Sequence, residues 1–164
     1  MEKNTGGNGW KMEKKIKPMI YQADRKLELL HFDKYKGYNY YILNLGTHPT
    51  AYVEIPKDNV LYGKDYNEIY DEGYYIDVHG GLTYSNSYLM GIETVNWFIG
   101  WDYAHCYDYS GYYDLIKDSV LIEGTKKWTT EEIIKECEDA IDQIIEIQKK
   151  NDILEELKSF QEVE

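Results

Sequence analysis

The stretch from residue 129 to 164 constrains the fold most, because its sequence is typical of one long helix. Thr129 and Glu132 have the spacing of a capping box, in which each side chain accepts a hydrogen bond from the other residue's amide. No glycine or proline follows as far as Glu164. Apolar residues recur at helical spacing and predict one buried face: Ile133, Cys137, Ala140, Ile141, Ile144 and Ile145.

The second half of this stretch is less regular. Gln148 interrupts the apolar series, which resumes after Asn151 with Ile153, Leu154, Leu157 and Phe160. The pattern therefore allows one continuous helix or two helices with a kink near Asn151. The stretch carries twelve acidic and four basic side chains. Such a charge run is typical of a solvated face, but it would also suit a partner surface or a mimic of nucleic acid.

Upstream of the helix, runs rich in tyrosine and β-branched residues predict strands. The predicted strands are residues 27–32 and 40–45, which form a hairpin, followed by 51–55, 74–78 and 94–101. The segment 62–66 is expected to be a loop or a short helical turn, 85–93 a polar turn, and 112–116 a short helix. The sequence thus predicts an α+β fold, with an antiparallel sheet of about five or six strands and a long C-terminal helix.

The 164 residues suit a single domain. Residues 1–17 contain a glycine-rich segment and an excess of lysine, which predicts a flexible tail. The single α+β domain is then expected over residues 18–164, with residues 129–164 as its acidic helix.

Composition limits the classes of partner. The net charge of −12 opposes direct binding to nucleic acid or to an anionic membrane. No apolar run reaches the roughly 18 residues of a membrane span. Cys106 and Cys137 lack metal-type spacing, and without a signal peptide they indicate free thiols in a reducing, cytoplasmic setting. The 18 tyrosines suit either a binding surface or a tyrosine-rich β core.

The candidate site lies just beyond the predicted strand 94–101. Asp102, His105 and Asp108 recur every third residue there, and His79 follows the preceding predicted strand. Two histidines and two aspartates suit Zn, Mn or Fe, and a bound ion could activate water for hydrolysis. Without a metal, His105 beside an aspartate could act as a general base. The same residues could also simply fix the loop by hydrogen bonds. None of the spacings matches a defined zinc motif.

Several neighbours are expected to contact a ligand. Gly80 and Gly81 could form a turn whose amides face an anion, and Lys64 is the nearest candidate cation. The complete expected ligand-binding set is His79, Gly80, Gly81, Thr83, Tyr84, Trp101 and Lys64. His48, an isolated loop histidine, could join the site, whereas neither cysteine is expected to be a nucleophile.

Four segments occur in this order: residues 62–66 (YGKDY), residues 78–84 (VHGGLTY), residues 97–105 together with Asp108, and the pair Glu136-Cys137 in the capped helix. Together they resemble a family of small uncharacterised bacteriophage and prophage proteins. The family pattern has an "HGGLTY" segment, a "GFDCAH-x-x-D" segment and a C-terminal helix with Glu-Cys. The resemblance covers roughly residues 51 to 147. The chain differs at Trp101, where the family has Phe, and at Tyr103, where it has Cys. The resemblance implies phage origin and carries no activity.

Three functions are compatible with these features. The first is a non-enzymatic phage accessory protein that inhibits a host target in the cytoplasm of the infected bacterium, such as an immune component or its nucleotide signal. The second is a small hydrolase of a nucleotide-like substrate, centred on the His/Asp cluster. The third is an acidic nucleic-acid mimic that inhibits a nuclease. The enzyme ranks second because few positive groups could receive a nucleotide. No cofactor is indicated beyond a divalent metal, and the C-terminal helix could pair with a second copy.

Overall fold

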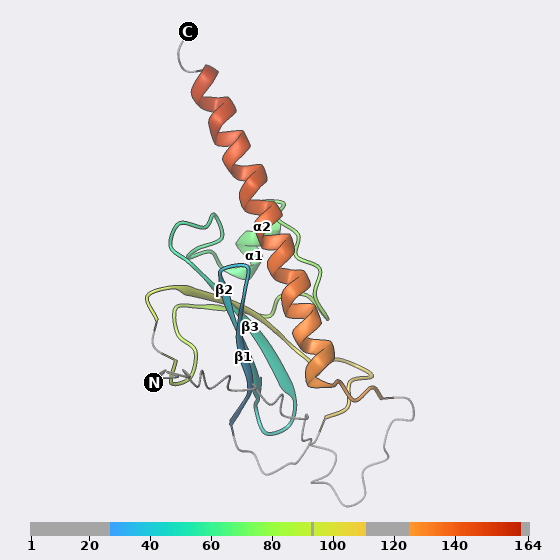
Figure 1. Cartoon of the computed structure of the whole chain (residues 1–164). Coiled ribbons are helices and arrows are strands. Elements are labelled where there is room, and N and C mark those ends of the chain that lie inside the picture. Colours follow the sequence, from blue (N-terminus) through green and yellow to red (C-terminus); the bar gives the residue numbers. More distant parts are fainter. Residues whose placement is uncertain (1–26, 93, 111–124, 162–164) are drawn as a thin grey trace, which may run out of the picture.

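The computed structural model describes residues 27–92, 94–110 and 125–161. Its elements are β1 (Glu28–Tyr35), β2 (Tyr38–Asn44), β3 (Pro49–Ile55), α1 (Tyr66–Asp71), β4 (Tyr84–Asn86), β5 (Trp97–Asp102) and α2 (Thr130–Gln161). The strands form one five-stranded antiparallel sheet in the order β1-β2-β3-β5-β4. The predicted α+β fold is therefore confirmed (Figure 1). The tail predicted for residues 1–17 and the short helix predicted at 112–116 lie outside the described residues.

The first hairpin is tighter than the sequence suggested. Tyr35 pairs with Tyr38, so only Lys36 and Gly37 form the turn. Both turn residues have positive φ, 45° for Lys36 and 92° for Gly37. Two positive φ values are typical of the type I′ turn, whose twist matches that of the flanking strands. β1 and β2 therefore run closer to the turn than predicted.

The prediction of a strand at residues 74–78 was wrong. Within the described residues this segment pairs with no strand, although Ile76 and Val78 are buried as the pattern suggested. Side chains of α2 bind two backbone amides here: Gln143 accepts from Asp77 and Glu136 accepts from His79, at 2.7 and 2.8 Å. The segment thus packs against α2 through its amides and apolar side chains.

The prediction of a turn over residues 85–93 was wrong for its first residues. Tyr84, Ser85 and Asn86 form the short edge strand β4, which pairs with Gly100, Ile99 and Phe98 of β5. This pairing gives the sheet its fifth strand. It also places β5 in the interior of the sheet, between β3 and β4.

Helix α2 covers one face of the sheet, where the main core lies (Figure 1). The predicted helical stripe is confirmed, because Ile133, Cys137, Ala140, Ile141 and Ile144 are fully buried. They pack with alternate residues of the central strands, including Ala51, Val53, Ile55, Ile99 and Trp101. A smaller cluster lies on the opposite face and consists of Tyr41, Leu43, Tyr52, Leu89 and Phe98. Every residue of β3 is buried, so this strand is covered on both faces.

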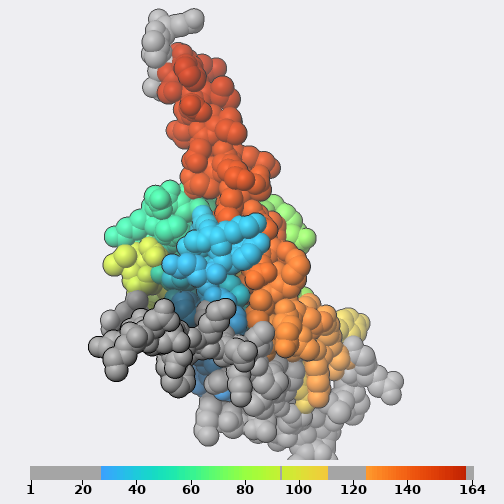
Figure 2. All heavy atoms as spheres, viewed as in Figure 1, coloured from blue at the N-terminus to red at the C-terminus, as the bar shows by residue number. Residues whose placement is uncertain are grey.

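Helix α2 is continuous through Gln161, without a kink at Asn151. Its predicted capping box is present: the Thr129 amide donates to Glu132 at 2.9 Å and the Glu132 amide donates to the Thr129 hydroxyl at 3.2 Å. Beyond Gln148, whose side chain accepts from the Val60 amide, the helix projects past the rest of the described fold (Figures 1 and 2). Four large apolar side chains of this part are 55–71% exposed: Ile153, Leu154, Leu157 and Phe160. Neither described helix combines the length and the apolarity that crossing a bilayer requires.

Candidate functional site

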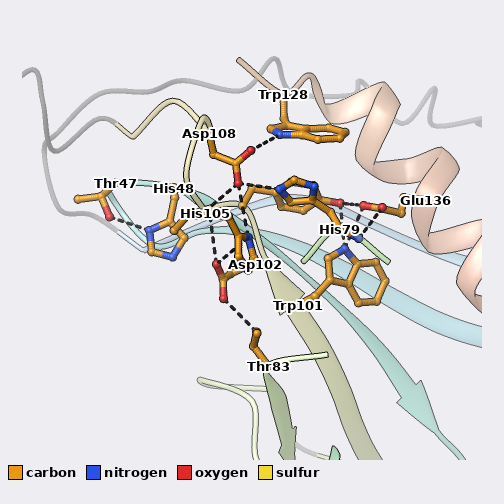
Figure 3. A network of polar contacts seen from close by, with 12 residues as sticks. Thr47, His48, His79, Thr83, Trp101, Asp102, His105, Asp108, Trp128 and Glu136 are labelled. Atoms are coloured by element: carbon orange, nitrogen blue, oxygen red, sulfur yellow. Dashed lines mark hydrogen bonds and ion pairs between the residues drawn. The ribbon is translucent and has the colours of Figure 1, made fainter. Parts of the chain in front are cut away.

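The end of β5 and the turn that follows it bring the predicted polar residues together. Asp102 is the last residue of β5, and the Asp108 amide donates to the His105 carbonyl at 2.9 Å, which closes the turn. His79 approaches from the segment that runs under α2. As Figure 3 shows, the four side chains converge on one region. From the sequence we expect His79 to lie beside the residues that follow β5, and the structure confirms this position.

A direct contact between His105 and Gly80 sets the position of the His105 ring. Gly80 has a φ of 68°, and a Cβ built on it would lie 2.1 Å from His105 Cε1. Only a glycine allows both this backbone conformation and the close approach of the ring. The His105 ring therefore packs against Gly80. The Gly81 amide donates to the Val78 carbonyl at 2.9 Å, so it is already hydrogen-bonded within its own turn.

Three ligand-type atoms lie within 4.8 Å of one another: one from His79, one from His105 and one from Asp108. His79 Nε2 is 2.7 Å from Asp108 Oδ2, within hydrogen-bond range. His105 Nδ1 is 3.5 Å from the same oxygen and 3.8 Å from Asp102 Oδ1. These two distances are too long for hydrogen bonds. His105 Nδ1 is thus a buried nitrogen without a hydrogen-bond partner.

Hydrogen bonds fix the Asp108 carboxylate from several directions. Trp128 Nε1 donates to Oδ1 at 2.8 Å, and the His105 amide donates to Oδ2 at 2.9 Å. Burial alone would raise the pKa of Asp108, but the hydrogen bonds from Trp128, His79 and the His105 amide together lower it. Asp108 is therefore held as an anion whose two oxygens have defined orientations.

Glu136 of α2 holds His79 in place through hydrogen bonds. Its carboxylate accepts from the His79 amide at 2.8 Å, from Trp101 Nε1 at 3.1 Å and from the Tyr103 hydroxyl. The Tyr103 ring stacks on the His79 ring, with centroids 5.2 Å apart and planes 5° from parallel. Burial, reinforced by Glu136, raises the pKa of Tyr103, so the phenol stays protonated and donates. The helix thus fixes both the backbone and the ring of His79.

Sequence reasoning did not assign Glu136, Tyr103 or Trp128 to the site. For Glu136 a signal was present. It stands three residues after Ile133 and one before Cys137, inside the predicted buried stripe of α2. A carboxylate at such a position must find hydrogen-bond donors in the interior. For Tyr103 and Trp128 we find no comparable signal in the sequence.

Of the remaining residues that the sequence assigned to ligand binding, some lie near the His/Asp cluster and one does not. Trp101 is 1% exposed, and Thr83 donates its hydroxyl to Asp102 Oδ2 at 2.9 Å. Lys64 lies at the opposite end of β5, where its carbonyl accepts from Trp97 Nε1, and its ammonium pairs with Glu72 at 2.7 Å. Six residues of strand span about 17 Å. The fold therefore does not bring Lys64 to the His/Asp cluster.

A cavity of about 190 Å³ adjoins the cluster, and Asp102 belongs to both. The lining residues are Leu45, His48, Thr50, Tyr52, Thr83, Tyr84, Trp101 and Asp102. His48 joins the site here, and its Nδ1 lies 2.9 Å from the Thr47 hydroxyl. Burial lowers the pKa of His48, although Asp102 and Asp108 act in the opposite direction.

The three donor atoms suit a divalent transition-metal ion. Bond lengths of 2.0–2.2 Å in a tetrahedral site place neighbouring donors about 3.3 Å apart. The distances of His79 Nε2 and His105 Nδ1 from Asp108 Oδ2, 2.7 and 3.5 Å, bracket this value. Three protein donors would leave a fourth position open, as in catalytic sites. Cys106 is exposed next to His105 but does not belong to the donor group.

A scan of the chain against protein-family models finds no match, and searches of curated proteins and of solved structures find no significant similarity either. The resemblance to bacteriophage proteins stays a prediction.

Proposed function

We propose that the protein binds a divalent transition-metal ion through His79 Nε2, His105 Nδ1 and Asp108 Oδ2, and that this site serves a hydrolytic reaction. One observation carries the proposal. His105 Nδ1 is buried without a hydrogen-bond partner 3.5 Å from Asp108 Oδ2, and His79, His105 and Asp108 each offer a ligand atom within 4.8 Å of the others. An unsatisfied buried polar group costs about 1–3 kcal/mol. A metal ion would use the lone pair of this nitrogen.

The types of donor narrow the choice of metal. Neutral imidazoles with one carboxylate suit Zn, Fe or Mn, whereas Mg and Ca prefer oxygen donors alone. A divalent ion bound with an open position lowers the pKa of water and so supplies a hydrolytic nucleophile near neutral pH.

The surrounding residues act by orienting the donors. Trp128 fixes one oxygen of Asp108 and leaves the other directed at the two histidines. Glu136 holds the backbone of His79, and the packing against Gly80 holds the His105 ring. Such contacts around the ligands normally affect metal affinity about 10- to 100-fold. The cavity beside Asp102 gives a substrate access to the edge of the cluster.

The proposal is tested by titrating metal-free protein with Zn²⁺ and Co²⁺, using calorimetry and visible absorption. We expect one ion per chain, and His105→Gln should weaken binding at least about tenfold. Cys106→Ser is the matched control, because this neighbouring exposed thiol lies outside the donor group. Equal affinity in wild type and His105→Gln, or loss of binding in Cys106→Ser alone, would refute the assignment.

A second candidate is the non-enzymatic phage inhibitor that the sequence ranks first. It is supported by the exposed apolar side chains on the projecting part of α2, which include Leu154, Leu157 and Phe160. Exposed apolar patches commonly mark protein–protein contacts. Affinity purification from infected cells with wild type and a Leu154→Glu/Leu157→Glu variant would test it. A partner retained equally by both proteins would exclude this surface.

The nucleic-acid mimic is less well supported by the described surface. Several carboxylates of α2 form ion pairs with lysines: Asp139 with Lys135, Asp142 with Lys36, and Glu146 with Lys149. Their charge is therefore partly neutralised locally. Salt-sensitive binding to a basic nuclease would support the mimic nonetheless.

A further inference from the structure

Asp102 connects the cavity to the three proposed metal donors. Asp102 lines the cavity, and its Oδ1 lies 3.8 Å from His105 Nδ1. Its Oδ2 accepts from Thr83, a second lining residue, at 2.9 Å (Figure 3). A molecule in the cavity would therefore lie against one side of Asp102, with the donor group on the other side.

The charge of the cavity wall favours a cation. Asp102 is the only acidic residue among the described lining residues, and none of them is a lysine or an arginine. Burial lowers the pKa of His48, so this ring supplies no fixed positive charge. A phosphate or carboxylate group placed here would face Asp102 without a compensating cation, whereas an ammonium group would pair with it.

Lysines near the cluster are already engaged. Lys126 pairs with Glu132 at 3.1 Å and lies over the Trp128 ring, 3.6 Å from its centroid. Lys127 lies over the Tyr109 ring at 4.2 Å. Recruiting either ammonium to an anion in the cavity would break these contacts.

Aromatic rings form the rest of the favourable surface for a cation. Tyr52 and Tyr84 meet edge to face, with centroids 5.2 Å apart, and both line the cavity. The Trp101 indole contributes no ring here, because it lies in the core on the α2 side of the sheet and donates to Glu136. The Tyr84 hydroxyl donates to the Tyr88 carbonyl, which fixes the ring. Aromatic faces attract ammonium groups by about 0.5–2 kcal/mol.

The size of the cavity suits a small molecule or a small group of a ligand. Its volume of about 190 Å³ is slightly above the roughly 150 Å³ of a cavity that holds benzene. It is below the roughly 300–1,000 Å³ of pockets for drug-sized ligands. A molecule or group of amino-acid size fits this volume.

On the basis of the proposed hydrolytic site, we infer that this cavity binds the substrate and selects a small molecule with a cationic amino group, held by Asp102 and the rings of Tyr52 and Tyr84. The substrate class is then a small amine of amino-acid size. The nucleotide-like substrate expected from the sequence does not belong to this class.

The test is an NMR titration of the full chain with three probes. L-alaninamide is a small cation, propionamide is the same molecule without its amino group, and AMP is an anionic nucleotide. We expect L-alaninamide to shift the resonances of Thr83 and Tyr84, which line the cavity, and to saturate, and propionamide to bind at least about tenfold more weakly. Asp102→Asn, which keeps the side-chain shape, should weaken L-alaninamide about tenfold, while Cys106→Ser, at an exposed residue outside the cavity lining, should not.

Each outcome of this titration is decisive. Tighter binding of AMP than of L-alaninamide, equal binding of propionamide, or full affinity in Asp102→Asn overturns the inference. Dispersed amide spectra of each variant confirm that it is folded. Repeating the titration in protein without and with Zn²⁺ separates the two proposals. Amine binding without any metal binding refutes the metal site alone, and metal binding without amine binding refutes the inference alone.

Discussion

The ring of His105 lies directly on the backbone of Gly80, so close that a Cβ there would be 2.1 Å from the ring carbon Cε1. Gly80→Ala should therefore displace His105 as well as strain a backbone with positive φ. Gly73→Ala is the matched control, because Gly73 also has positive φ but has no atom within 4 Å of the position that the added methyl group would occupy. Both variants should lose about 1–2 kcal/mol of unfolding free energy from backbone strain.

Only Gly80→Ala should also weaken Zn²⁺ binding, by at least about tenfold. Urea unfolding and calorimetric titration measure the two effects separately. Unchanged Zn²⁺ affinity in Gly80→Ala would show that the position of His105 does not matter for metal binding.

Glu136 links α2 to His79 through three hydrogen bonds, accepting from the His79 amide, Trp101 and Tyr103. Glu136→Gln would turn one acceptor into a donor that faces other donors. We expect a loss of about 1–3 kcal/mol in the free energy of unfolding and weaker metal binding. Glu138→Gln, on the same helix, should change stability by less than about 0.5 kcal/mol. Similar effects of the two substitutions would contradict the anchoring role.

Glu54 of β3 should make the fold sensitive to acid. Burial would raise the pKa of this carboxyl, but hydrogen bonds from Thr94, Asn39, Asn96 and Tyr41 lower it. A lowered pKa in the folded state gives a stabilisation that is complete above the unfolded pKa of about 4.3. That stabilisation is lost as the pH falls through the folded pKa. Glu54→Gln should therefore cost about 1–3 kcal/mol at pH 7 and less at about pH 3, as measured by urea unfolding. A constant difference across this range would contradict the prediction.

The projecting part of α2 allows a test of the predicted pairing of two copies. If the apolar side chains of Leu154 and Leu157 form that contact, the chain should behave as a dimer in light scattering at micromolar concentration. Leu154→Glu/Leu157→Glu should then be monomeric, with little change in the stability of the core, because both side chains are more than half exposed in the single chain. A wild-type protein that is monomeric at all concentrations would show that the helix does not pair.

The parts of the fold that depend on local sequence were predictable. The capping box and the stripe from Ile133 to Ile144 follow from residues three to four positions apart, and both are confirmed. The segment 74–78 was assigned wrongly because the amides of Asp77 and of the adjacent His79 bind Gln143 and Glu136, which are 66 and 57 positions away in the chain. Periodicity alone does not distinguish a strand from an extended segment that packs under a helix.

In the candidate site, too, the contacts between residues close in sequence were predictable and the long-range contacts were not. Asp102, His105 and Asp108 lie on one short turn, so their proximity could be inferred from spacing. Lys64 was grouped with them only by its place in the chain, and β5 separates it from them. The contribution of Glu136 depends on how α2 crosses the sheet, which no local pattern specifies.

The most direct test of the central claim is a crystal structure of the protein grown with Zn²⁺, with anomalous data collected at the zinc edge. The proposed site predicts one strong anomalous peak about 2.0–2.2 Å from His79 Nε2, His105 Nδ1 and Asp108 Oδ2. The absence of a peak between these three atoms, or a peak only at the exposed Cys106, would contradict it.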